Sequence, residues 1–126
     1  SSPRPSNGSG GKPGNHAKET IEINKVQRHY KLLVPKSVEV KTPAPLVFAL
    51  HGLGDSKELM SFYSQLDRLA EKHAFVLIYP NGRNKMWPLL PAIAKDDLAF
   101  FDALYQRATS EYNIDLNRVY VVGMSN

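Results

Sequence analysis

The sequence predicts an α/β fold: a mostly parallel sheet with crossover helices and an amino-terminal antiparallel hairpin. Two short, continuously apolar runs, 46–50 and 75–79, are typical of parallel strands covered on both faces. One stretch with helical spacing of its apolar residues lies between these runs, and a second follows them. Such alternation favours a parallel sheet with crossover connections. The chain has 126 residues, 42% of them hydrophobic, which is enough to bury one core.

The first 18 residues differ in composition from the rest. They are dominated by Gly, Ser and Pro, and they hold too few apolar side chains to offset the entropy lost on ordering. We therefore predict a flexible tail or linker over residues 1–18 and a folded domain over residues 19–126. A linker of this kind, in a chain that begins with Ser1, favours an exported protein, so we expect a secreted location, extracellular or periplasmic.

The hairpin is predicted from two alternating segments. Ile21 and Ile23 alternate with polar neighbours, and so do Tyr30, Leu32 and Val34 before Pro35 ends the run. The pattern indicates two edge strands joined by a tight turn.

The helices are predicted from apolar residues that recur on one face. The first such face comprises Phe62, Leu66, Leu69, Ala70 and His73. The second follows Asp96 and comprises Leu98, Phe101, Leu104, Tyr105 and Ala108. A final buried strand is expected over 119–122, preceded by a turn that holds Asp115 and Arg118.

Charge and cysteine content exclude several classes of function. Of the net charge of +4, +3 lies in residues 1–18, which leaves +1 for the predicted domain and no footprint for a nucleic acid. The absence of cysteine excludes disulfides, thiolate metal sites and a cysteine nucleophile. The longest apolar run, 74–79, is too short to cross a bilayer as a helix, so we expect no membrane span.

The strongest chemical signal is at the end of the sequence. Gly123, Met124, Ser125 and Asn126 match four of the five positions of the GxSxG nucleophile elbow, and an apolar strand precedes them. The elbow exposes its serine on a sharp turn between a strand and a helix, so Ser125 is the candidate nucleophile. The alternative is an ordinary turn at the end of a strand.

An oxyanion hole is predicted from a second loop, HGLG, which follows the apolar run 46–50. The backbone amides of Leu53 and Asn126 are the expected donors to the developing oxyanion. Gly52 and Gly54 allow the Leu53 amide to approach without obstruction, and His51 is expected to brace the loop. Trp87 is the candidate substrate-binding residue of the apolar loop 81–95; this loop as a whole could instead fold over the core.

Several of these segments together carry a family resemblance. From residue 45 onward the chain contains LHGLGD, FVLIYPNG, Trp87, DDLAFF and YNIDLNRVYVVGMSN. It thereby resembles the α/β-hydrolase serine esterases grouped as polyhydroxybutyrate depolymerases and feruloyl esterases. The resemblance implies an α/β-hydrolase fold, a secreted-type esterase, a substrate with a polymeric or aromatic acyl ester, a serine nucleophile, and neither metal nor cofactor.

The same resemblance covers only the amino-terminal half of such an enzyme. Its triad runs serine, acid, histidine along the chain, so the acid and the base are expected beyond residue 126 and His51 is not the base. We therefore expect the 126 residues alone to be nearly inactive. The last segment is shared with dienelactone hydrolases and prolyl-oligopeptidase-like hydrolases, so these remain alternatives, as does a truncated domain without catalysis.

Overall fold

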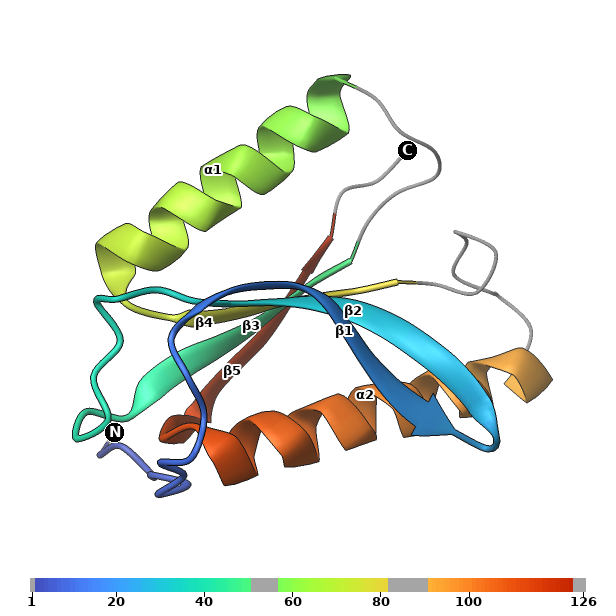
Figure 1. Ribbon diagram of the computed structural model, residues 1–126, viewed down its shortest axis with the longest axis horizontal. Coiled ribbons are helices and arrows are strands. Elements are labelled where there is room, and N and C mark those ends of the chain that lie inside the picture. The colour runs from blue at the N-terminus through green and yellow to red at the C-terminus, as the bar shows by residue number, and fades with distance from the viewer. Residues whose placement is uncertain (1, 51–56, 82–90, 124–126) are drawn as a thin grey trace.

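The computed structural model describes residues 2–50, 57–81 and 91–123, without the side chains of 57–60 and 91–96. Its elements form three layers, with helix α1 on one face of a twisted sheet and helix α2 on the other (Figure 1). The sheet order is β1-β2-β4-β3-β5, and β3 runs parallel to both β4 and β5. The elements are β1 Gly14–Ile23, β2 Val26–Val34, β3 Ala44–Leu50, α1 Lys57–His73, β4 Val76–Pro80, α2 Pro91–Glu111 and β5 Ile114–Gly123.

The predicted antiparallel hairpin is confirmed by the pairing of β1 with β2. Ile23 pairs with Val26, so the connection has only two residues, Asn24 and Lys25. Both have positive φ, 50° and 67°, which is the backbone of a type I′ turn. The hairpin joins the parallel strands through β2, which lies antiparallel to β4, so β1 is an edge strand as predicted but β2 is not.

Strands β3 and β4 are buried on both faces, as their apolar runs predict. Toward α2, Leu46, Phe48 and Ile78 pack in a cluster with Phe100 and Leu104. Toward α1, Val47, Ala49, Leu77 and Tyr79 pack with Ala70 in a second cluster. Successive side chains of β3 and β4 thus point to opposite faces of the sheet and pack in different clusters.

Helix α2 differs from the prediction in its start and in its buried face. It begins at Pro91, so residues 91–95 belong to the helix and not to the predicted loop. Leu98, predicted on the core face, is 67% exposed, whereas Phe100 is fully buried. Leu104 and Ala108 are buried and Phe101 and Tyr105 pack against the core, as predicted, so the prediction of this face is wrong at Leu98 alone.

Strand β5 begins earlier than predicted and contains an irregularity, and its predicted burial over 119–122 is wrong, because Tyr120 and Val121 are 49% and 62% exposed. Ala44 lies opposite Ile114, but Leu46 lies opposite Val119, so β5 has extra residues at this point. Asp115 and Arg118, predicted in a turn before the strand, lie in this bulge. Asp115 Oδ2 accepts a 2.6 Å hydrogen bond from Arg118 Nε, which ties the two ends of the bulge together.

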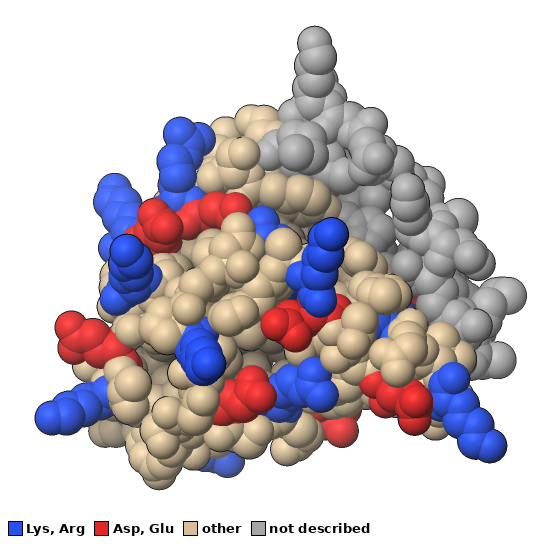
Figure 2. Space-filling view, viewed as in Figure 1, with Lys and Arg blue, Asp and Glu red and all other residues tan. Residues whose placement is uncertain are grey.

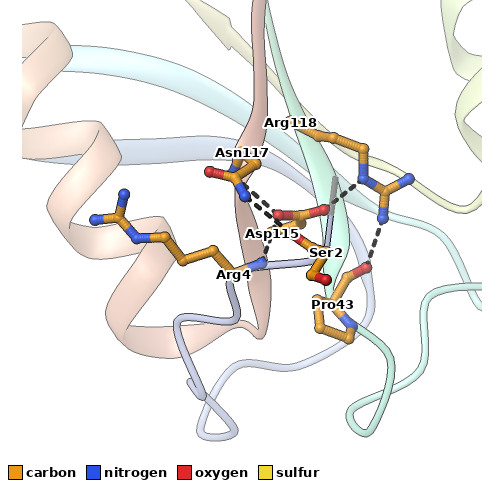
Figure 3. A network of polar contacts seen from close by, with 6 residues as sticks. All are labelled: Ser2, Arg4, Pro43, Asp115, Asn117 and Arg118. Carbon is orange, nitrogen blue, oxygen red and sulfur yellow. Dashed lines mark hydrogen bonds and ion pairs between the residues drawn. The ribbon is translucent and has the colours of Figure 1, made fainter.

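The prediction of a flexible tail over residues 1–18 is wrong for most of that segment, which is bonded to the domain. Strand β1 begins at Gly14, and residues 4–11 lie beside the start of β5 and the end of α2 (Figure 3). Ser6 N donates to Ile114 O, Leu116 N donates to Arg4 O, and both bonds are 2.8 Å long. The segment is held by backbone hydrogen bonds, which an argument from side-chain burial does not detect.

The glycines of this segment let its backbone lie close to Tyr112, so their presence does not indicate flexibility here. A Cβ atom on Gly8 would lie 2.6 Å from the backbone nitrogen and oxygen of Tyr112. Gly8 is buried, and no larger residue fits there without a shift of the backbone. Whether residues 1–18 also join this domain to another module stays a prediction.

Candidate active site at the carboxyl edge of the sheet

The three loops predicted to carry the site all follow the carboxyl ends of the parallel strands. Strand β3 ends at Leu50, β4 ends at Pro80 and β5 ends at Gly123. Leu50 and Gly123 are paired in register, so β3 and β5 end side by side. In open α/β sheets ligands bind outside this edge.

Most of the predicted site residues lie outside the residues that the structure describes. These are the oxyanion-loop residues His51, Gly52, Leu53 and Gly54, the loop residue Trp87, and the elbow residues Ser125 and Asn126. Gly123 is described: a Cβ atom there would lie 3.7 Å from Leu50 Cβ, an ordinary contact. The described neighbours therefore do not require glycine at position 123, and its role in the elbow stays a prediction.

A buried ion pair lies next to Asn81, the first residue after β4. Arg28 Nη2 is 2.8 Å from Asp97 Oδ1, and the two residues are only 4% and 8% exposed. The guanidinium carbon also lies 4.2 Å from the centre of the Phe100 ring. The pair joins the first residues of β2 to α2 in the α2-facing layer.

The α1-facing layer has its own polar group near the end of β4. The Tyr79 hydroxyl donates a 2.6 Å hydrogen bond to Asp67 Oδ1 and lies 3.1 Å from the Tyr63 carbonyl oxygen. Burial, together with this bond to Asp67, raises the pKa of Tyr79 well above its usual range. Lys31 Nζ lies 3.6 Å from the other Asp67 oxygen. The end of β4 is thus fixed on both faces of the sheet.

Sequence reasoning did not single out Arg28 as a residue of this edge. The alternation that turns Tyr30, Leu32 and Val34 inward also turns Arg28 inward, and a buried arginine needs an acidic partner. Asp97 lies directly after Asp96, where the second helix is predicted to start. It is structural here, but its partner is Arg28, 69 residues away.

Charged side chains of the two signs are mixed on the face shown in Figure 2, and the described residues hold no metal-binding group. Among the described residues, no three His, Asp or Glu side chains are grouped so that they could hold a metal ion. Neither helix, over its described residues, is long and apolar enough to cross a membrane.

Two curated relatives are esterases by name. The chain is 27% identical to feruloyl esterase D of Neurospora crassa over an aligned length of 135 residues. This alignment covers 96% of the chain and 45% of that relative. Over 84 residues it is 30% identical to a bifunctional acetylxylan esterase/xylanase of Neocallimastix patriciarum, which covers 65% of the chain and 12% of that relative. No protein-family model matches the chain.

Solved structures agree with the fold. An S-formylglutathione hydrolase of Staphylococcus aureus matches 87% of the chain and 46% of its own length with a TM-score of 0.64 at 13% identity. A thermostable esterase matches 86% of the chain and 34% of its own length with a TM-score of 0.53 at 26% identity. A ferulic acid esterase of Anaeromyces mucronatus matches 90% of the chain and 50% of its own length with a TM-score of 0.57 at 16% identity.

The chain spans half the length or less of each of these relatives and structures. Over that span its fold matches the three solved structures, with TM-scores of 0.53 to 0.64. The chain therefore has the α/β-hydrolase fold, and it resembles the serine esterases of the feruloyl esterase group.

Proposed function

We propose that the chain supplies the nucleophile and the oxyanion hole of a serine hydrolase that cleaves carboxylic esters. The observation that carries the proposal is the pairing of Leu50 with Gly123. Because β3 and β5 end side by side, the HGLG loop and the GMSN turn start from neighbouring points of the same sheet edge. That is the arrangement in which an elbow serine and an oxyanion loop act on one carbonyl group.

The proposed reaction proceeds through an acyl-enzyme. Ser125 Oγ attacks the ester carbonyl carbon while a histidine base takes its proton, and the alcohol leaves with a proton returned by that histidine. Water then attacks the acyl-enzyme, releases the acid and restores the serine. The Leu53 and Asn126 amides stabilise the oxyanion of each tetrahedral intermediate. The histidine and its acidic partner are proposed to follow Ser125, in the order typical of this fold.

An aromatic acyl group is the proposed substrate feature. The similarity to a feruloyl esterase supports it, and Trp87 is the proposed apolar contact for the aromatic ring. A polymeric acyl ester of the polyhydroxybutyrate type and a secreted location stay predictions. No metal or cofactor takes part in the proposed chemistry.

The natural full-length protein tests the proposal. It should hydrolyse methyl ferulate and acetyl esters and become labelled by a fluorophosphonate probe at Ser125. Ser125→Ala should abolish the labelling and lower kcat/KM by roughly 10³-fold or more. Hydrolysis of peptide amides faster than of esters would instead support a peptidase-like enzyme. Unlabelled, inactive full-length protein would support a domain without catalysis.

A further inference from the structure

A small pocket lies between the amino-terminal segment, the hairpin and the end of α2. It has a volume of about 270 Å³, and the residues of its wall all belong to the described part of the chain. The polar groups of the wall come from all three parts: residues 10–12, His16, Glu19, Tyr30, Arg107 and Glu111. Pockets for drug-sized ligands have roughly 300–1,000 Å³, so this pocket suits a smaller molecule.

Hydrogen bonds hold the walls of this pocket in place. The backbone nitrogen of Gly11 donates a 2.9 Å bond to the carbonyl oxygen of Glu111. The Lys12 carbonyl oxygen accepts from the Tyr112 hydroxyl and from His16 Nε2, each at 2.9 Å. The pocket is therefore already formed when the amino-terminal segment is docked.

One corner of the pocket offers hydrogen-bond donors. Arg107 Nη1 donates to the Thr20 carbonyl oxygen at 3.0 Å and to the Tyr30 hydroxyl at 2.9 Å, which uses both of its hydrogens. Among the described residues, Arg107 Nη2 and Nε have no acceptor, and neither has the hydroxyl hydrogen of Tyr30, a residue only 4% exposed. Buried hydroxyl groups normally have a partner, so this corner suits a ligand acceptor.

The neighbouring corner offers an acceptor. Glu111 follows Arg107 by four residues on α2, a spacing at which opposite charges usually pair. Arg107 is turned to the hairpin instead, and the Glu111 carboxylate makes no bond with the described part of the chain. The bond to Tyr30 raises the pKa of Arg107, and the charges of Glu111 and Glu19 raise it further, so the two carboxylates lie near the guanidinium without contact.

The charges of the wall balance. Lys12 and Arg107 are opposed by Glu19 and Glu111, so the lining has no net charge when His16 is neutral. A ligand of one sign finds as much repulsion as attraction there. A ligand that carries both signs on one small frame can meet both corners at once.

We propose that this pocket binds a small zwitterion, a free amino acid or a dipeptide. Its carboxylate lies against Arg107 and Tyr30, where the guanidinium can donate two parallel bonds, and its ammonium group lies against Glu111. Because residues 10–12 form one wall, the ligand binds only when the amino-terminal segment is docked. The pocket is not part of the proposed esterase site, since Tyr112 in its wall precedes β5 and the elbow follows that strand.

Calorimetric titration of the natural full-length protein with glycylglycine, at neutral pH and low salt, tests the site. We expect a Kd of about 1 mM. N-acetylglycylglycine lacks the ammonium charge and glycylglycinamide lacks the carboxylate, so each should bind at least about tenfold more weakly. Equal binding of the three, or no binding of glycylglycine, would overturn the proposal. Tighter binding of glucose would overturn it too, because the pocket would then recognise hydroxyl groups.

A glutamate variant with a matched control locates the binding. Glu111→Gln keeps the shape of the side chain and the carbonyl that accepts from Gly11, and it should weaken glycylglycine binding about tenfold. Glu71→Gln on α1 is the control. The Glu71 carbonyl likewise accepts a bond, from Ser37 Oγ, and its carboxylate likewise has no partner among the described residues. This control should leave Kd unchanged; a wild-type Kd in Glu111→Gln would contradict the assigned site.

Hydrogen exchange tests the part of the amino-terminal segment. The Gly11 N–H is bonded to Glu111, so it exchanges when the segment leaves its place. A ligand that binds only the docked state, at ten times its Kd, should slow this exchange about tenfold. Unchanged exchange at saturating glycylglycine would show that the segment does not close the pocket. None of these measurements depends on ester hydrolysis, so they separate this site from the proposed esterase function.

Discussion

Asp115 is a carboxylate removed from solvent and surrounded by hydrogen-bond donors. Its Oδ1 accepts from the backbone nitrogens of Arg4 and Asn117 at 3.0 Å each, and its Oδ2 accepts from Arg118. The Arg4 N–H, followed by the Arg118 side chain, lowers the pKa of Asp115 below its ordinary value. One side chain therefore joins the amino-terminal segment to the bulge of β5 (Figure 3).

Asp115→Asn should lower stability at neutral pH more than at acid pH. A carboxyl group with a lowered folded-state pKa stabilises the protein above its unfolded pKa of about 3.9 and loses this effect as the pH falls through the folded value. Urea unfolding of wild type and variant at pH 7 and at pH 3 measures the difference. The gap between the two proteins should shrink at pH 3; an equal gap at both pH values would contradict the role of the charge.

Tyr79→Phe should lower the free energy of unfolding by about 1 kcal/mol, because it removes the hydroxyl that donates to Asp67. The pKa of Tyr79 is raised, so its contribution is complete below the unfolded value of about 10 and is lost as the pH rises above it. Chemical unfolding at pH 7 and pH 11 tests both statements. Tyr120→Phe, at a residue that is 49% exposed on β5, is the control and should change little.

At the scale of elements, the sequence predicted each strand and helix, and the differences lie at their ends and faces. Apolar runs and alternation report burial well, so β3, β4 and the hairpin were predicted correctly. Helical spacing placed Leu69 and Leu98 on core faces, but they are 43% and 67% exposed. Leu98 was placed inward because only apolar residues were counted. The inward position belongs to Asp97, whose partner is distant in sequence.

For the site, sequence motifs predicted the nucleophile and the oxyanion amides, which lie outside the described residues. Pairs such as Arg28–Asp97 depend on tertiary contacts, which spacing along the chain does not encode.

The turn of the hairpin permits a stabilising change. Lys25 has φ of 67°, a left-handed conformation that is unfavourable for a residue with a side chain and favourable for glycine. Asn-Gly is the preferred pair in a type I′ turn, so Lys25→Gly should raise the free energy of unfolding by roughly 0.5–1 kcal/mol. Thermal and urea unfolding measure the gain. Glu22→Gly, in the adjacent strand, should lower stability instead; a loss in both variants would contradict the turn assignment.

At the scale of the whole molecule, β5 is the last strand in the sheet order, and its two halves differ in how they are covered. Pro5 forms an antiparallel bridge with Asp115, so the amino-terminal segment lies along the first half. From Val119 onward, no strand among the described residues pairs with the outer edge. Tyr120 and Val121 are 49% and 62% exposed there. Such an edge is a site where chains self-associate.

Val121→Lys should reduce self-association of the 126-residue chain, because a charge on an uncovered strand hinders edge-to-edge pairing. Val40→Lys is a matched control, since Val40 is also 62% exposed but lies between β2 and β3. Light scattering and sedimentation at several concentrations measure the effect. Equal behaviour of the two variants would show that β5 is not the associating surface.

The contact between the amino-terminal segment and β5 also sets the order in which the chain can fold during synthesis. Arg4 and Asp115 are 111 residues apart, so the amino-terminal segment of this domain has no partner until β5 has been made. At about 5–20 residues per second, that delay is roughly 5–20 s. The hairpin and the strands up to β4 can pair within that time. This segment is thus among the last of the described segments to take its place, beside the start of β5.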